Sequence, residues 1–125
     1  DEYRKILEFS PGDISANNNL GMVYFVKNKK EETLYYLERA VKADPNAEYI
    51  NLNLANAYFH FGDKEKALAN YLKLLTIHPD NLSAIFNIGI INYENKNYSE
   101  AKKYFLKVLT LDPKNEEAKK LLSDI

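Results

Sequence analysis

Three asparagines with a fixed spacing carry the side chains of this sequence best suited to binding chemistry. Asn19, Asn53 and Asn87 are evenly spaced, 34 apart in the numbering. A carboxamide has an acceptor oxygen and two N–H donors, so it can bind the C=O and the N–H of a peptide backbone together. This binding does not depend on the side chains of the peptide. A column of such amides would therefore hold an extended peptide.

Side chains suited to catalysis or to metal binding are sparse. The chain has two histidines, His60 and His78, and no cysteine, so it offers no thiolate ligand and no thiol nucleophile. It also lacks the P-loop, the G-x-G-x-x-G fingerprint and the H-E-x-x-H pattern. We therefore expect no enzymatic activity, no cofactor and no metal site.

The overall composition excludes two classes of partner. The 125 residues are 46% hydrophobic and carry a formal net charge of −1, with a pI of about 6.2. Such a chain has no electrostatic attraction for nucleic acid, and it has no run of roughly 18 apolar residues that could insert into a membrane. The absence of cysteine fits a reducing compartment, with the cytoplasm as the default. Because the sequence does not begin with methionine, we expect it to be a segment of a longer protein.

The elements that must position the asparagines repeat with the same period. The four prolines are also spaced 34 apart: Pro11, Pro45, Pro79 and Pro113. Alignment on these prolines predicts one array of repeats in residues 1–125. Its parts are the end of a preceding repeat at 1–13, complete repeats at 14–47, 48–81 and 82–115, and the start of a further or capping helix at 116–125.

Each complete repeat has the apolar spacing of two helices. In the second repeat, Leu54 and Tyr58 are one helical turn apart, and Ala67, Tyr71 and Leu74 follow at i, i+4 and i+7, which is one face of a second helix. Residues after the prolines are expected to cap the first helices: Asn46, Asp80 and Asn115. Capping boxes are expected at two second helices: Asn28 with Glu31, and Asn97 with Glu100.

The motif Leu20-Gly21-x-x-Tyr24, its counterpart Leu54-Ala55-x-x-Tyr58, and the later alanine, aromatic residue and proline resemble the tetratricopeptide repeat family. The resemblance covers the whole chain. It implies an all-α fold, a right-handed superhelical solenoid of antiparallel helix hairpins. It also implies a protein–protein interaction module, a scaffold or adaptor that binds an extended peptide or partner segment in a concave groove.

Two sets of positions bear on how the helices pack. Small residues such as Gly21 and Gly89 should allow close approach of the two helices of a hairpin, with Ala67 or Ala101 opposite. The family's tryptophan is absent from its place, and one of its tyrosines is replaced. We expect weaker packing at these positions: Asn17, Asn51, Ile85 and Asn92.

The face of the first helices opposite the hairpin contact is the predicted groove. At 100° per residue it comprises fifteen residues, none of them charged: Ser15, Asn18, Asn19, Met22, Phe25, Tyr49, Leu52, Asn53, Asn56, Phe59, Ser83, Phe86, Asn87, Ile90 and Tyr93. The predicted peptide-binding residues are the amides and apolar neighbours among them: Asn18, Asn19, Asn53, Asn56, Asn87, Tyr49, Leu52, Phe59, Phe86, Ile90 and Tyr93. The alternative for the apolar members is packing between repeats.

Two known grooves of the family give different expectations. A similar asparagine column holds substrate backbones in the O-linked GlcNAc transferases, and the resemblance implies this role for Asn19, Asn53 and Asn87 alone. The carboxylate clamp for acidic chaperone tails uses two Lys, two Asn and an Arg. Its places here hold Asn18, Met22, Asn53, Ser83 and Asn87, and a frame shifted by one repeat puts Leu52, Glu117 and Leu121 where cations belong. We therefore expect no clamp.

Two alternative functions remain open at this stage. The chain could be a self-associating structural array, a homo-oligomer formed through its terminal half-repeats. The apolar residues at these ends are Tyr3, Ile6, Phe9, Leu121, Leu122 and Ile125. The chain could instead be the substrate-recruiting region of a larger enzyme.

Overall fold

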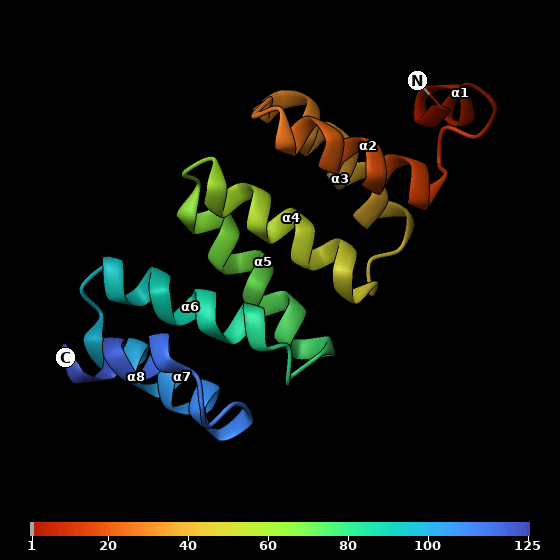
Figure 1. Cartoon of the computed structure of the whole chain (residues 1–125). Coiled ribbons are helices and arrows are strands. Elements are labelled where there is room, and N and C mark those ends of the chain that lie inside the picture. Colours follow the sequence, from red (N-terminus) through yellow and green to blue (C-terminus); the bar gives the residue numbers. More distant parts are fainter. Residues whose placement is uncertain (1) are drawn as a thin grey trace. The chain divides into compact units, whose positions relative to one another are not determined.

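The computed structural model describes residues 2–125, apart from the side chain of Phe9. Within these residues all regular elements are α-helices (Figure 1). In chain order they are α1 (Glu2–Phe9), α2 (Ile14–Val26), α3 (Lys30–Ala43), α4 (Glu48–His60), α5 (Lys64–Ile77), α6 (Leu82–Glu94), α7 (Tyr98–Leu111) and α8 (Glu116–Ser123). The prediction of an all-α fold is confirmed.

The helices keep the period of the sequence. The first helices α2, α4 and α6 each have 13 residues and begin at the interval that separates the prolines. The second helices α3, α5 and α7 each have 14 residues and begin at the same interval. The repeated sequence pattern is therefore a repeated pair of helices.

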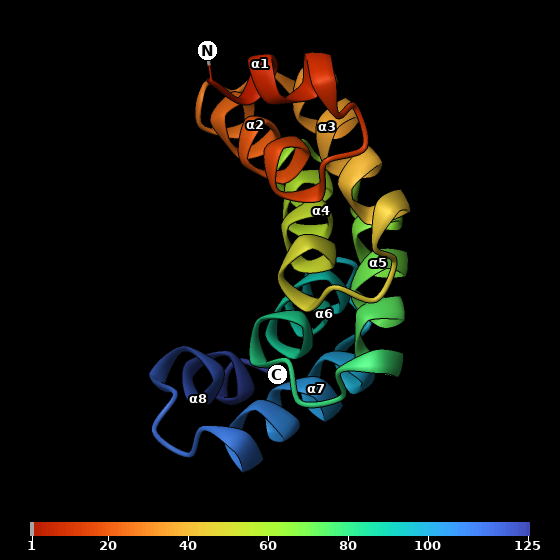
Figure 2. The same ribbon diagram turned by 90° about the vertical axis from the view of Figure 1, so that its right-hand side faces the viewer.

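The helices are grouped into two compact units, one up to Asn70 and one from Tyr71 onward, with the division inside α5. In the first unit α2 packs along α3, while α1 contacts α2 and α4 contacts α3 (Figure 2). In the second unit α6 packs along α7, and α8 contacts α7. Each unit thus contains a hairpin flanked by helices of the neighbouring repeats.

The helices of two hairpins, α2–α3 and α6–α7, approach closely at a glycine. A Cβ atom on Gly21 would lie 2.8 Å from Leu37 Cδ2, and one on Gly89 would lie 2.6 Å from Phe105 Cε1. The prediction of close packing is confirmed at these glycines. The atoms nearest to a Cβ on Gly89 belong to Phe105, one helical turn beyond the predicted Ala101, so the side chain of Phe105 fills the space that the glycine leaves.

The positions expected to pack weakly are buried. Exposure is 0% at Asn17, 2% at Asn51, 0% at Ile85 and 9% at Asn92. The asparagine amides bind backbone oxygens, as in Asn92, whose Nδ2 donates to Ile88 O at 2.9 Å. The three asparagines thus fill their buried places with hydrogen bonds to the backbone, and Ile85 fills its place with an apolar side chain.

The turn inside each hairpin has a common backbone form. Asn28, Gly62 and Lys96, spaced 34 apart, have φ of 59°, 87° and 64°. The N–H of the next residue reaches back to the helix, as in Asp63 N to Tyr58 O at 2.9 Å, which is the Schellman ending. Asn28 therefore ends α2 and does not begin α3, so the capping box predicted there is wrong, and the N-cap of α3 is Lys29. Asn97 is the N-cap of α7 as predicted, but it lacks the side-chain bond of a capping box.

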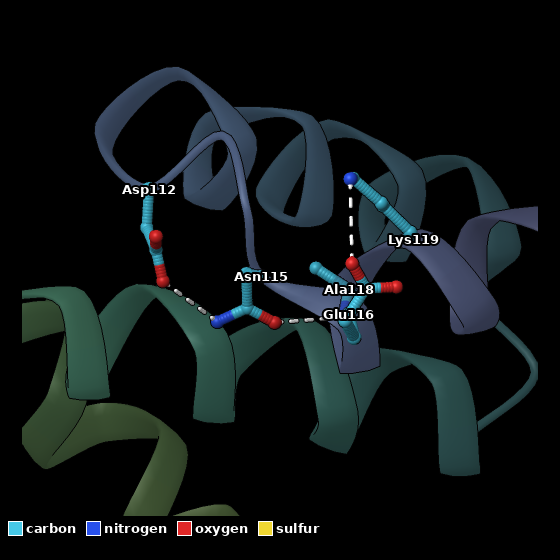
Figure 3. Close-up of polar contacts among 5 residues, drawn as sticks. All are labelled: Asp112, Asn115, Glu116, Ala118 and Lys119. Carbon is cyan, nitrogen blue, oxygen red and sulfur yellow. Dashed lines mark hydrogen bonds and ion pairs between the residues drawn. The ribbon is translucent and has the colours of Figure 1, made fainter.

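The first helices begin at asparagine or aspartate in most repeats. Asp13, Asn81 and Asn115 each accept a hydrogen bond from the backbone N–H at i+3. Figure 3 shows this cap at Asn115, as the sequence predicted. The predictions at Asn46 and Asp80 were one residue early, because the caps are Ala47, which has no side-chain acceptor, and Asn81.

Substitutions at the left-handed turn positions should shift stability in opposite directions. A Cβ on Gly62 meets nothing within 4 Å, so Gly62→Ala tests the backbone alone. We expect it to lower the free energy of unfolding by about 1 kcal/mol, and Lys96→Gly to raise it by about 0.5–1 kcal/mol. Urea titrations followed by circular dichroism measure both changes. Equal signs for the two variants would contradict this account.

Candidate peptide-binding site

The eleven predicted site residues have different environments. Asn19 and Tyr49 are exposed and Asn18 is buried, and the remainder are partly buried: Leu52, Asn53, Asn56, Phe59, Phe86, Asn87, Ile90 and Tyr93. The prediction that Asn18 belongs to an exposed face is corrected, because its exposure is 4%.

In the first unit, an amide pair joins α2 to α4. Asn53 Nδ2 donates to Asn18 Oδ1 at 3.1 Å. Asn18 is buried because it faces the next first helix, where it receives this hydrogen bond. The contact uses one of the two N–H donors of Asn53 and fixes the direction of its carboxamide, while Asn19 stays exposed beside it.

The end of this face near the hairpin turns is aromatic. The Phe25 ring lies 4.8 Å from the His60 ring and 6.0 Å from the Phe61 ring, centroid to centroid. His60 Nε2 lies 2.9 Å from Asn28 Oδ1, so the end of α4 is tied to the turn after α2. Phe25 thus packs between successive repeats, the alternative that the sequence left open for it.

In the second unit, the same face contains a pocket of about 200 Å3. Its lining residues come from α6, from the turn before α8 and from α8 itself: Leu82, Ser83, Phe86, Asn87, Asn115 and Glu117. Two of them, Phe86 and Asn87, are predicted site residues. Phe86, Ile90 and Tyr93 also pack against the core cluster around Phe105, so they have a structural role in addition.

The amide of Asn87 has a partner inside the protein. It forms a hydrogen bond with the hydroxyl of Tyr71, which is fully buried. Burial raises the pKa of Tyr71 above its usual range, and the hydrogen bond from Asn87 acts in the opposite direction. The tyrosine is therefore neutral at physiological pH, and the orientation of the Asn87 amide is fixed.

Glu117 and Asn115 were absent from the predicted site. They line the pocket from the last turn and from the incomplete last repeat, whereas the prediction counted only the first helices of complete repeats. Glu117 holds the second place of its repeat, as Ser15, Tyr49 and Ser83 do in theirs. Extension of the repeat period to the end of the chain would have found it.

A second hollow, of about 320 Å3, lies between α1 and α3. Its lining includes Arg4, Tyr35, Tyr36 and Arg39. Arg39 donates to Pro11 O at 2.7 Å, and Arg4 donates to the Tyr24 hydroxyl. Both arginines already have hydrogen-bond partners within the protein. This hollow is therefore a weaker candidate for a ligand site than the pocket of the second unit.

Metal sites and membrane spans are both lacking among the described residues. Residues 2–125 contain no group of three or more His, Asp or Glu side chains placed to hold a metal ion. None of the helices in that range has the length and apolar character that crossing a bilayer requires.

Solved structures resemble this chain over most of its length. The crystal structure of MamA has a TM-score of 0.89 at 18% identity, over 96% of this chain and 70% of that one. The first tetratricopeptide domain of Spaghetti (RPAP3), bound to the HSP90 peptide SRMEEVD, has a TM-score of 0.82 at 25% identity, over 89% and 88%. The NMR structure of the first such domain of human RPAP3 has 0.79 at 25%, over 92% and 91%.

Sequence comparison gives the family. No curated protein sequence matches the chain significantly. Two family profiles described as tetratricopeptide repeat match residues 19–81 and 83–115, and the first of them alone spans half of the chain. The chain belongs to the tetratricopeptide repeat family.

Proposed function

We propose that this chain is a protein-interaction module that binds an extended peptide segment of a partner on the uncharged faces of its first helices, opposite the hairpin contacts. The observation that carries the proposal is the composition of these faces. Fifteen residues in the three complete repeats include no Asp, Glu, Lys or Arg, although 28% of the chain is charged. A face without charge favours contacts with a peptide backbone and with apolar side chains.

The asparagine column supplies the proposed backbone contacts. In the first unit Asn19 and Asn53 would make these contacts, and in the second unit Asn87 supplies a contact of the same kind. The bond of Asn53 to Asn18, 3.1 Å long, and that of Asn87 to Tyr71 fix two of the three amides before a ligand arrives. Fixed amides lose less conformational freedom on binding, which favours affinity.

The proposed partner segment differs in charge from the peptide in the RPAP3 complex. That peptide, SRMEEVD, has three acidic residues. The same faces of the first helices have no Lys or Arg in the complete repeats and so lack charge-assisted donors for carboxylates. We therefore propose a partner segment that is not acidic.

Substitution of Asn19 tests the backbone contact. A random peptide library displayed on phage is selected on the full chain, and the affinity of the best peptide is measured by fluorescence polarisation. We expect Asn19→Ala to weaken binding about tenfold through the loss of one or two hydrogen bonds. Its unfolding midpoint should not change, because Asn19 is exposed. Asn97→Ala, at an exposed position without a cap bond, is the matched control and should bind normally.

A chemically altered peptide separates backbone from side-chain recognition. N-methylation at the peptide bond facing Asn19 should weaken binding to the unaltered chain and have no further effect on Asn19→Ala. Equal losses on both chains would exclude the backbone contact. If selection enriches no peptide while light scattering shows a mass that grows with concentration, the proposal fails in favour of self-association.

Self-association remains the alternative function, because apolar residues are exposed at both ends of the chain. Ile6 is 44% exposed and Ile125 is 40% exposed, whereas Leu121 and Leu122 are packed in part against the core of the second unit. The prediction for Phe9 concerns a side chain outside the described residues.

A further inference from the structure

We propose that the pocket of the second unit binds a basic side chain of the partner peptide, an arginine or a lysine. The inference rests on the proposed function and narrows its ligand. The pocket has a volume of about 200 Å3, and its walls combine an apolar floor with one carboxylate.

Leu82 and Phe86 are the apolar residues of the pocket lining, and together they are called its floor. Both side chains pack against the core of the second unit, and the Phe86 ring lies 5.9 Å from the ring of Phe105. The floor is thus held in place by the core. The long aliphatic stem of arginine or lysine covers such a surface while its charged end stays at the rim. An aromatic ring in the floor adds a favourable contact with the cation.

Glu117 gives the rim its charge. It is the one charged residue among the six that line the pocket, and it is exposed. The neighbouring carboxylate of Glu116 is already paired with Lys119, with 3.6 Å between Oε1 and Nζ (Figure 3). Glu117 is therefore the carboxylate that can receive a cation from the peptide.

Asn115 holds the turn that places Glu117. Its Oδ1 accepts from Ala118 N at 2.9 Å, and its Nδ2 donates to Asp112 Oδ2 at 3.3 Å (Figure 3). These two bonds cap α8 and tie it to the end of α7. The amide of Asn115 thus acts on the pocket through the position of α8, while Ser83 and Asn87 remain as polar neighbours of the ligand.

The start of α8 could instead attract an acidic side chain, because helix N-termini favour anions. Two features oppose this. The side chain of Asn115 occupies the backbone N–H of Ala118, and Glu117 places a carboxylate in the first turn, beside the Glu116 carboxylate that Lys119 already pairs. A full charge on a carboxylate exceeds the partial charge of the helix end, so the pocket selects a cation.

A charge exchange at Glu117 tests the inference. The displayed random peptide library is selected in parallel on the full-length chain, on Glu117→Lys and on Glu116→Lys. We expect the unaltered chain to enrich Arg or Lys at one peptide position, and Glu117→Lys to enrich Asp or Glu at that position. Glu116→Lys makes the same change of charge one residue away, outside the pocket lining, and should keep the preference for Arg or Lys.

A synthetic pair of peptides gives the size of the effect. Replacement of the selected arginine by citrulline keeps its shape and removes its charge. We expect this to weaken binding to the unaltered chain about two- to fivefold, as for a solvent-exposed ion pair, and to leave binding to Glu117→Gln nearly unchanged. The melting temperature of Glu117→Gln shows that this variant is folded.

The outcomes separate the two proposals. Enriched peptides without a basic position, or with a preference that Glu116→Lys alters as much as Glu117→Lys does, would overturn the basic pocket and leave the peptide-binding function standing. Selection that enriches no peptide at all overturns the proposed function and the pocket with it.

Discussion

Replacement of Gly89 by valine is expected to lower the free energy of unfolding by about 3 kcal/mol, at the upper end of the cost of overpacking a core. Even the Cβ atom would lie 2.6 Å from Cε1 and 2.8 Å from Cδ1 of Phe105. The Phe105 ring is fully buried and contacts the ring of Phe86, so it cannot move aside without disturbing the core. The gain in helix propensity on replacing glycine is smaller, up to about 1 kcal/mol.

A double-mutant cycle shows whether the clash is the cause. Phe105→Ala alone should cost about 3–5 kcal/mol through the cavity it leaves. In Gly89→Val/Phe105→Ala the valine enters that cavity, so the double variant should be more stable than the sum of the single changes by about 1–3 kcal/mol. Urea unfolding followed by circular dichroism measures all three variants.

A matched substitution on the same helix is the control. Ser83 is exposed, and serine and valine have similar helix propensities. Ser83→Val should change the free energy of unfolding by less than about 0.5 kcal/mol. Purely additive effects of Gly89→Val and Phe105→Ala would contradict the close contact between α6 and α7.

The period of the sequence predicts the helices because each repeat buries equivalent apolar residues in the same pair of helices. Evenly spaced prolines end one pair of helices and begin the next, and the helix boundaries keep that interval. The caps were less predictable. Asn28 and Glu31 have the spacing of a capping box, but Asn28 is in the left-handed conformation that ends α2. A local motif cannot show which of two adjacent helices a turn residue belongs to.

The site was predicted in part, for reasons of geometry. A helical wheel gives one exposed side, yet a first helix in an array also contacts the next first helix. Asn18 lies toward that neighbour and is buried by its bond with Asn53. The helical periodicity likewise predicted the same role for Asn19, Asn53 and Asn87. In the structure Asn19 is exposed, whereas Asn87 contacts the buried Tyr71. Such partners depend on residues distant in sequence, which spacing alone does not reveal.

Asn51 combines burial with hydrogen bonding, and its replacement by alanine should have the second large effect on stability. Its Nδ2 donates to Pro45 O and to Ala47 O, both at 2.8 Å, and its side chain is 2% exposed. These bonds join the turn between two repeats to the helix that follows. Asn17 binds the equivalent turn in the same way, with Nδ2 donating to Pro11 O at 3.0 Å.

We expect Asn51→Ala to lower the free energy of unfolding by about 3 kcal/mol, since it leaves a cavity and removes the side-chain donor to the buried turn. Asn51→Ile should cost about half as much, because it restores volume without the donor, and Ile85 fills the same place in the third repeat with 0% exposure. Urea unfolding measures both, with exposed Asn97→Ala as the control. Losses in the free energy of unfolding below about 0.5 kcal/mol for both variants would show that the turn does not depend on the Asn51 amide. Equally large losses for Asn51→Ala and Asn51→Ile would assign the whole destabilisation to the lost hydrogen bonds and none of it to the cavity.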